Sequence, residues 1–149
     1  MSLHAFCSGA NVIALEKDGQ KYGMTCAWST MLDYDYLGML LGSQSTTGNS
    51  LKVGDVVGVS ALSKSQKEIA LIFGESHSDD NNKFSKVNYS QEGSALLIIG
   101  AKVNMICEVV DIKHILPNSD DNFVILKVIK SIQNKDKDFL LLEDVYPLK

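Results

Sequence analysis

Short apolar runs separated by polar turn residues dominate the chain. Asn11–Leu15 is one such run, and a second, Tyr22–Trp28, follows soon after Asp18-Gly19. Asp-Gly between two apolar segments is a strong signal for a two-residue turn, so these residues predict a β-hairpin. Similar runs predict further strands, and Asn122–Ile132 has so many apolar residues that we expect burial on more than one side; the other strands are Tyr36–Leu41, Val56–Leu62, Ser94–Ile99, Met105–Lys113 and Phe139–Leu142.

One segment, Ser63–Phe73, has helical spacing instead, with apolar residues at Ile69, Ala70 and Phe73. Ser63 followed three residues later by Gln66 fits a capping box, and Gly74 stands where a glycine often ends a helix. Many short strands with one clear helix predict a mainly β protein, a β-barrel with short helical decorations.

The composition is that of one ordinary globular domain, which we expect to span residues 1–149. Of the 149 residues, 45% are apolar and 21% charged, and the formal net charge is −4. This mildly acidic balance argues against nucleic acid or an anionic membrane as a partner, because either would need a broad basic face. We also expect no membrane span, because the apolar runs are far shorter than the roughly 20 residues of a spanning helix. We expect no signal peptide, because Met1–Ala14 lacks a basic start followed by a continuous apolar stretch.

The cysteine pattern and the missing motifs narrow the chemistry. Cys7, Cys26 and Cys107 are widely spaced and odd in number, which is typical of free thiols in a reducing cytoplasm. We therefore expect a cytoplasmic protein. The sequence has no Gly-x-x-x-x-Gly-Lys-Ser/Thr phosphate loop, no Gly-x-Gly-x-x-Gly turn and no Cys-x-x-Cys, and its three histidines are scattered, so no metal site is predicted.

The strongest candidate for a ligand site is the polar segment Gly42–Ser50, directly after a predicted strand. Its small residues let backbone N–H groups turn inward, and four hydroxyl side chains lie between Gly42 and Gly48. That composition suits an anion nest for a phosphate. A plain solvated loop explains the same residues, because Ser, Thr, Gly and Asn are ordinary turn formers.

Two further segments are candidates. In Gly23–Thr30, hydroxyl residues alternate with apolar ones around Trp28, the single tryptophan of the chain. Such a strand edge can offer backbone hydrogen bonds to a flat polar ring while Trp28 covers the ring or closes an interface, although a half-buried strand with a core tryptophan fits as well. Phe73–Phe84 predicts a helix end followed by a polar, solvated loop at Ser76–Lys83.

Taken in order, these segments resemble the flavin reductase-like family, whose members form the FMN-binding split barrel. The resemblance covers nearly the whole chain and implies a Greek-key-like split β-barrel of the FMN-binding type, with a homodimer that holds one FMN per subunit near its interface. It rests on Asp18-Gly19, Gly23-Met24-Thr25-Cys26-Ala27-Trp28-Ser29-Thr30, the Ser/Thr loop Gly42–Gly48, Phe73-Gly74, Lys83-Phe84 and Tyr146.

The resemblance also implies which residues bind the flavin. One group, from the first motif, would line the isoalloxazine ring and ribityl chain through mostly backbone contacts: Met24, Thr25, Cys26, Ala27, Trp28 and Ser29. A second group would hold the phosphate and the ribityl end: Ser43, Gln44, Ser45, Thr46 and Thr47. Ser78 and Lys83 would approach from the third segment. No catalytic side chain is expected, because the flavin carries the redox chemistry.

The function implied by the resemblance is that of an NAD(P)H:flavin oxidoreductase, with NADH or NADPH as the electron donor. One departure bears on this expectation. Reductases of the family carry a late Gly-Asp-His beside the nicotinamide, whereas Asn122 stands here in the place of that histidine, after Asp121. Two alternatives therefore stay open: an FMN-containing electron carrier reduced by a redox partner protein, and a split-barrel binding protein without a redox cofactor.

Overall fold

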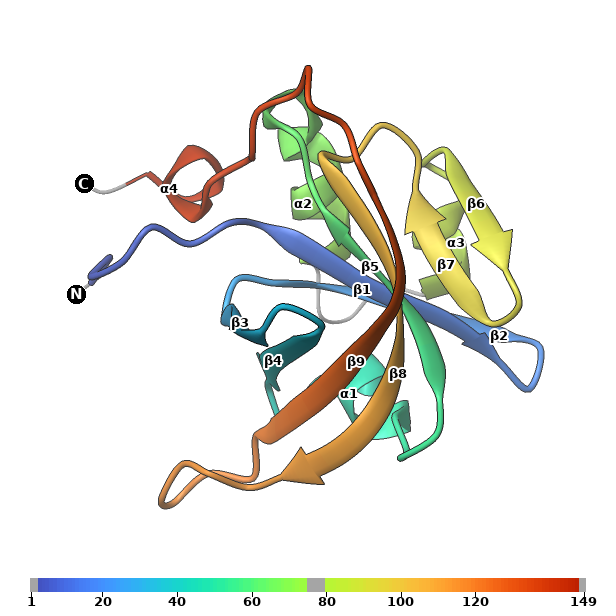
Figure 1. Ribbon diagram of the computed structural model, residues 1–149, viewed down its shortest axis with the longest axis vertical. Coiled ribbons are helices and arrows are strands. Elements are labelled where there is room, and N and C mark those ends of the chain that lie inside the picture. The colour runs from blue at the N-terminus through green and yellow to red at the C-terminus, as the bar shows by residue number, and fades with distance from the viewer. Residues whose placement is uncertain (1–2, 75–79, 148–149) are drawn as a thin grey trace.

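The computed structural model describes residues 3–74 and 80–147. Within these ranges, nine strands form one antiparallel sheet that curls on itself, and a few short helices lie against it (Figure 1). The mainly β class expected from the sequence is confirmed. The strands are β1 Asn11–Lys17, β2 Gln20–Cys26, β3 Ser29–Asp33, β4 Tyr36–Leu41, β5 Val56–Ala61, β6 Tyr89–Glu92, β7 Ala95–Ile98, β8 Val103–Lys113 and β9 Asn122–Gln133.

The helical elements are short. The helix expected over Ser63–Phe73 is confirmed as a 3₁₀ turn, Lys64–Gln66, that continues into helix α2, Lys67–Phe73. The Ser63 N–H donates to Gln66 Oε1 at 3.0 Å, as expected for the capping box. The other helices are α1 Thr46–Ser50, α3 Asp80–Phe84 and α4 Leu142–Val145.

The β1–β2 hairpin turns at the residues that the sequence indicates. Asp18 and Gly19 have φ values of 54° and 77°, and strand pairing continues from Lys17 and Gln20 outward. Positive φ at both central residues is the geometry of a type I′ turn, whose twist matches that of the flanking strands. The Asp-Gly prediction is therefore confirmed.

Strand β1 is buried on both faces, which explains its unbroken apolar run. Ile13 and Leu15 face the barrel interior, where they pack with residues such as Met39 and Val57. The alternate residues, Val12 and Ala14, belong to a second core that includes residues of α2, α3 and α4. Because successive side chains of a strand point to opposite faces, a strand between two cores shows no polar alternation.

The barrel is open between β2 and β4. The strand order is β3-β4-β9-β8-β5-β1-β7-β6, and β2 pairs with the other side of β1. The end of β2 and the segment after it approach β4, where the Leu40 N–H donates to Trp28 O at 2.8 Å and the Cys26 thiol donates to Leu40 O at 3.4 Å. The residues that the sequence marks as a ligand site surround this opening.

Two expected strands differ from the observed ones near the site and at the C-terminus. The strand expected to reach Trp28 ends at Cys26, because the Ser29 N–H donates to Ala27 O at 2.9 Å and turns the chain into β3. Trp28 is 59% exposed, so the alternative of a core tryptophan is wrong. Phe139–Leu142 makes only isolated bridges with the chain before β1 and after β5, and α4 begins at its last residue.

The expectation that Asn122–Ile132 is buried on several sides holds for only half of β9. Val124 and Leu126 are fully buried, whereas Ile129 and Ile132 are 57% and 65% exposed. The reason is pairing: β4 lies beside β9 only as far as Lys127, and beyond that point β8 is the neighbour of β9 in the sheet that the described residues form.

Two segments expected to be loops contain helical turns. α1 forms inside the Gly42–Ser50 segment and α3 forms at the end of Ser76–Lys83. Strong helix formers are absent from α1, and α3 has only Lys83. α1 is held by its cap, Ser45, and α3 by the tertiary contacts of Phe84, so residue propensity alone does not reveal them.

Candidate functional site: a groove at the opening of the barrel

A groove at the barrel opening consists of two adjoining cavities. The first, of about 210 Å³, reaches from β2 and the turn after β4 to the ends of α2 and α3; it is lined by Gly23, Met24, Thr25, Gly42, Gln44, Ser45, Thr46, Thr47, Phe73, Gly74 and Lys83. The second, of about 480 Å³, continues along β2 and is lined by Met24, Thr25, Cys26, Ala27, Trp28, Leu40, Gly42, Gln44, Leu116 and Asp121. The two share four residues, so they form one site.

The turn after β4 is ordered by its own residues. The Ser45 N–H donates to Gly42 O at 3.0 Å, and Ser45 Oγ accepts from the Gly48 N–H at 2.9 Å, which caps α1. Ser45 Oγ also donates to Met24 Sδ at 2.8 Å, so the cap is tied to β2. The first turn of α1, with the buried Thr47, therefore lies at one end of the groove.

Lys83 adds a positive charge to the lining of the first cavity. Its side chain lines the first cavity, and the residue is only 4% exposed, which is rare for a lysine. The neighbouring Phe84 fixes α3 by packing edge to face on Phe73 at 4.9 Å. A Cβ on Gly23 would lie only 2.8–2.9 Å from the nearest atoms of both rings, so a glycine is needed at this position of β2.

Hydroxyl side chains and buried ammonium groups are donors that suit an anion. Ser45, Thr46, Thr47 and Lys83 all line the first cavity, so this cavity fits a phosphate group better than an apolar one. Charge-assisted hydrogen bonds of this kind need no broad basic surface, which agrees with the acidic composition of the chain.

Along β2, the polar side chains bind the protein itself. Thr25 Oγ1 donates to Ala70 O at 2.7 Å and so joins β2 to α2. The Cys26 side chain is buried in the core, and burial raises the pKa of its thiol. Backbone groups are what this strand offers to a ligand, and the exposed Trp28 stands at its end as an aromatic surface.

The structure brings most of the predicted site residues together in the groove: Met24, Thr25, Cys26, Ala27, Trp28, Gln44, Ser45, Thr46, Thr47 and Lys83. Ser29 lines neighbouring cavities of about 150 and 360 Å³ instead. Ser43 lies in the turn but is not part of the lining, and its N–H donates to Asp121 Oδ1 at 2.7 Å. Ser78 lies outside the described residues.

Seven residues of the lining are not among the predicted site residues: Gly23, Leu40, Gly42, Phe73, Gly74, Leu116 and Asp121. The three glycines and Phe73 belong to the motifs that carry the resemblance, and Leu40 belongs to a predicted strand. Leu116 gives no signal in an irregular segment, and Asp121 enters the sequence analysis only through the departure at Asn122. The structure also pairs Asn122 with a histidine, because Asn122 Oδ1 lies 3.0 Å from His114 Nε2 across the β8–β9 connection. The available signal for Asp121 is the pair of polar residues Asp121 and Asn122 at the start of a predicted strand.

Among the described residues, no group of three or more His, Cys, Asp or Glu side chains could hold a metal ion. In the same part of the chain, no helix combines the length and apolar character needed to span a membrane.

The family of the chain follows from its match to a family model. The model of the flavin reductase like domain matches residues 3–146. The chain belongs to this family. Membership confirms the resemblance drawn from the sequence and the expected function class, a flavin reductase-type oxidoreductase. A comparison with curated protein sequences finds no match.

Solved structures of similar fold include further flavin reductases. The NADH:FAD oxidoreductase of Streptomyces globisporus C-1027, solved with NAD and FAD fragments, is 22% identical with a TM-score of 0.81, covering 94% of this chain and 83% of that one. The styrene monooxygenase flavin reductase of Pseudomonas putida S12 is 23% identical, with a TM-score of 0.73 over 87% and 82%. The FMN-binding protein of Thermus thermophilus is 16% identical, with a TM-score of 0.74 over 87% and 72%. These likenesses confirm the split-barrel fold of this flavin reductase-like chain.

Proposed function

We propose that the chain binds FMN in the groove and uses NADH or NADPH to reduce it. The phosphate would lie against Ser45, Thr46, Thr47 and Lys83, and the ring along the backbone of β2 towards Trp28. The observation that carries this proposal is that the buried Lys83 and the capped turn of α1 line the same cavity, while the adjoining cavity is lined by β2 and an exposed tryptophan. The second cavity alone, of about 480 Å³, has the volume of a small-molecule site, and the first cavity extends it.

When bound, the flavin supplies the electron-transfer chemistry between the nicotinamide and an acceptor. The chain binds, orients and shields it. Thr25 has its hydroxyl committed to Ala70 O, and the Cys26 thiol is buried, so these residues would contact the ring through main-chain groups. We therefore propose no acid or base role for Thr25 or Cys26.

A second function, an FMN-containing electron carrier, is favoured by one observation. Asn122 replaces the family's histidine, and its side-chain oxygen is engaged by His114 at 3.0 Å. A carrier would bind FMN in the same groove but would receive electrons from a redox partner protein. The response of the bound flavin to NADH and NADPH therefore distinguishes the two functions.

We further propose a homodimer with the groove near its interface, acting in the cytoplasm. Two features support the dimer: β3 is an edge strand whose Met31 and Leu32 are exposed, and the exposed Trp28 stands beside it. Three unpaired cysteines support a reducing compartment. A redox partner protein is also proposed, because one structural neighbour is the flavin reductase of a styrene monooxygenase.

The phosphate assignment can be tested with two ligands and two variants. FMN should bind more tightly than riboflavin, which lacks the phosphate, by about tenfold or more, because each charge-assisted hydrogen bond contributes about 1.5–3 kcal/mol. Affinities would be measured by quenching of flavin fluorescence. Equal affinity of the two ligands would contradict the assignment.

Ser45→Ala and Ser45→Asp separate the cap from the ligand contact. Ser45→Ala should cost about 1 kcal/mol of stability through loss of the α1 cap and also weaken FMN binding. Ser45→Asp keeps a capping oxygen but adds a negative charge, so it should retain stability and lose the preference for FMN over riboflavin. If Ser45→Asp binds FMN as the wild type does, the phosphate lies elsewhere.

A further inference from the structure

The β8–β9 connection lies against the turn that follows β4. The Ser43 N–H donates to Asp121 Oδ1 at 2.7 Å, the short distance expected for a hydrogen bond to a carboxylate. Asp121 lines the second cavity, and Gly42 and Gln44, on either side of Ser43, line both cavities. The Asp121 carboxylate therefore joins two walls of the groove, the β8–β9 connection and the turn after β4.

Both ends of this link are themselves fixed. The Asp121 N–H donates to Ser119 Oγ at 3.1 Å, and the next residue, Asn122, is paired with His114. On the other wall, Ser43 O accepts from Asn49 Nδ2 of α1 at 2.7 Å. The link thus joins two segments that are already ordered, so it can set the distance between the groove walls at little further cost in entropy.

We propose that Asp121 is a positioning residue for flavin binding, which holds the Gly42–Ser45 turn in the conformation that binds the phosphate end of the flavin. The proposal rests on the proposed function. Asp121 acts through the backbone N–H of Ser43, so the phosphate binds the turn and not the carboxylate. The link uses the backbone N–H of Ser43 and not its hydroxyl, which the resemblance places against the flavin.

Simple electrostatics predicts the opposite effect. A carboxylate in the wall of a site for a phosphate repels the ligand, so its removal should strengthen binding. A positioning carboxylate must weaken binding when its acceptor oxygen is removed or displaced, because the turn then loses its fixed geometry. The sign of the change in affinity therefore distinguishes the two effects.

Three substitutions at Asp121 and one control test the proposal. Asp121→Ala removes the acceptor and should raise the Kd of FMN about tenfold or more, the equivalent of one lost charge-assisted hydrogen bond. Asp121→Asn keeps an acceptor oxygen in place without the charge, so its Kd for FMN should remain within about threefold of the wild-type Kd. Asp121→Glu keeps the charge but displaces the oxygen, so it should weaken binding as Asp121→Ala does. Asp120→Ala removes an exposed carboxylate of the same connection and should not weaken binding.

The Kd of FMN would be measured by fluorescence quenching, and urea unfolding without flavin would show whether each variant folds. The expected result is a Kd of FMN near the wild-type value in Asp121→Asn and a raised Kd in Asp121→Glu. This comparison tests the proposal even if Asp121→Ala is too unstable to assay. Wild-type affinity in Asp121→Glu, or tighter binding in Asp121→Ala, would overturn the positioning role while leaving the proposed function intact. A wild-type protein that binds no FMN would overturn both.

Discussion

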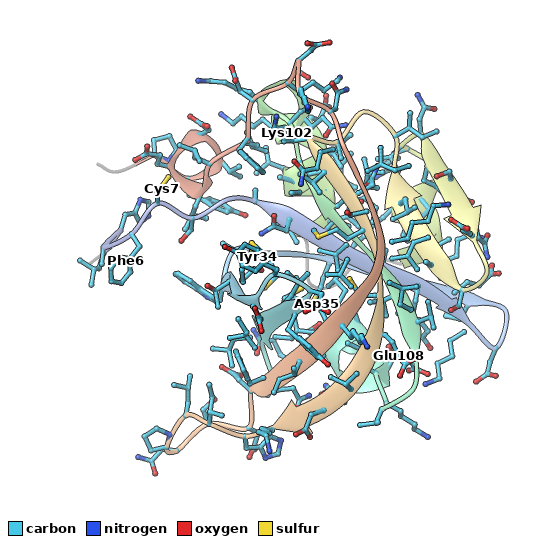
Figure 2. The ribbon with its side chains drawn as sticks, viewed as in Figure 1. Phe6, Cys7, Tyr34, Asp35, Lys102 and Glu108 are labelled. Carbon is cyan, nitrogen blue, oxygen red and sulfur yellow. The ribbon has the colours of Figure 1, made fainter. Side chains whose placement is uncertain are left out.

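At the scale of single residues, burial decides which groups of the site are available for chemistry. Cys26 lies at the groove, yet its thiol is buried and donates weakly to Trp28 O and Leu40 O. Burial raises the pKa of Cys26, and it raises that of Cys107 to about 12. Cys7, in contrast, is exposed on the N-terminal segment at the edge of the molecule (Figure 2). A cysteine within a cofactor motif is thus here a core residue, and it is inert because the thiolate is the reactive form.

We therefore predict that a thiol reagent at neutral to mildly alkaline pH labels Cys7 rapidly and reaches the two buried cysteines only on unfolding.

The raised pKa has a further consequence for Cys107. The native state keeps this thiol protonated between pH 9.0 and about 12, while the unfolded state loses the proton, so its contribution to stability is lost as the pH rises through that range. Urea unfolding of the wild type and Cys107→Val should show a flatter alkaline decline in the variant. Rapid labelling of Cys107 in the native protein would contradict this account.

At the scale of elements, the start of α2 depends on a single amide side chain. Gln66 is only 8% exposed; it accepts from the Ser63 N–H at 3.0 Å and donates to Ile99 O at 3.0 Å. It therefore satisfies a backbone donor of the helix start and a carbonyl after β7 together. α2 in turn positions Phe73 and Gly74 at the groove.

Gln66→Ala should accordingly lower the free energy of unfolding by about 2 kcal/mol, because two backbone groups lose their partners. Gln66→Glu keeps an acceptor for the Ser63 N–H but loses the donor to Ile99 O. It should therefore destabilise the protein only through the loss of the hydrogen bond to Ile99 O. Urea denaturation measures both. Lys64→Ala, at an exposed position of the same turn, is the matched control and should change stability little. A Gln66→Ala variant as stable as this control would exclude the role of Gln66 as a link.

The elements that the sequence reveals are those with a local signal. The hairpin at Asp18-Gly19 and the capping box at Ser63 can be recognised because each is specified by neighbouring residues. Helix α3 cannot, since its Phe84 is placed by a ring contact with Phe73, which comes from another element. The pairing of Ser43 with Asp121, 78 residues apart, is likewise a product of topology. The sequence motifs predict many of the residues that line the groove, but not Leu116 or Asp121 and not the hydrogen bonds that join its parts.

At the scale of the molecule, the opening of the barrel and its exposed apolar edge suggest an incomplete site in the single chain. Tyr34, at the β3–β4 turn, is 95% exposed (Figure 2). Ile129 and Ile132 are exposed on β9. Apolar residues on an edge strand and its surroundings are typical of surfaces that pair with another chain. We predict that sedimentation of the purified protein shows a dimer and that Met31→Asp weakens it. A monomer that binds FMN with undiminished affinity would contradict the proposed homodimer.

The central claim is that this chain binds FMN and reduces it with a nicotinamide. The most direct test is to mix the FMN-loaded protein with NADH, and separately with NADPH, in the absence of oxygen while recording the visible flavin band. The account predicts that the band is lost rapidly with at least one of the two, much faster than for the same concentration of free FMN. A band that persists with both nucleotides but is lost on addition of dithionite would contradict the reductase and leave the electron carrier. A protein that acquires no flavin band would contradict the claim entirely.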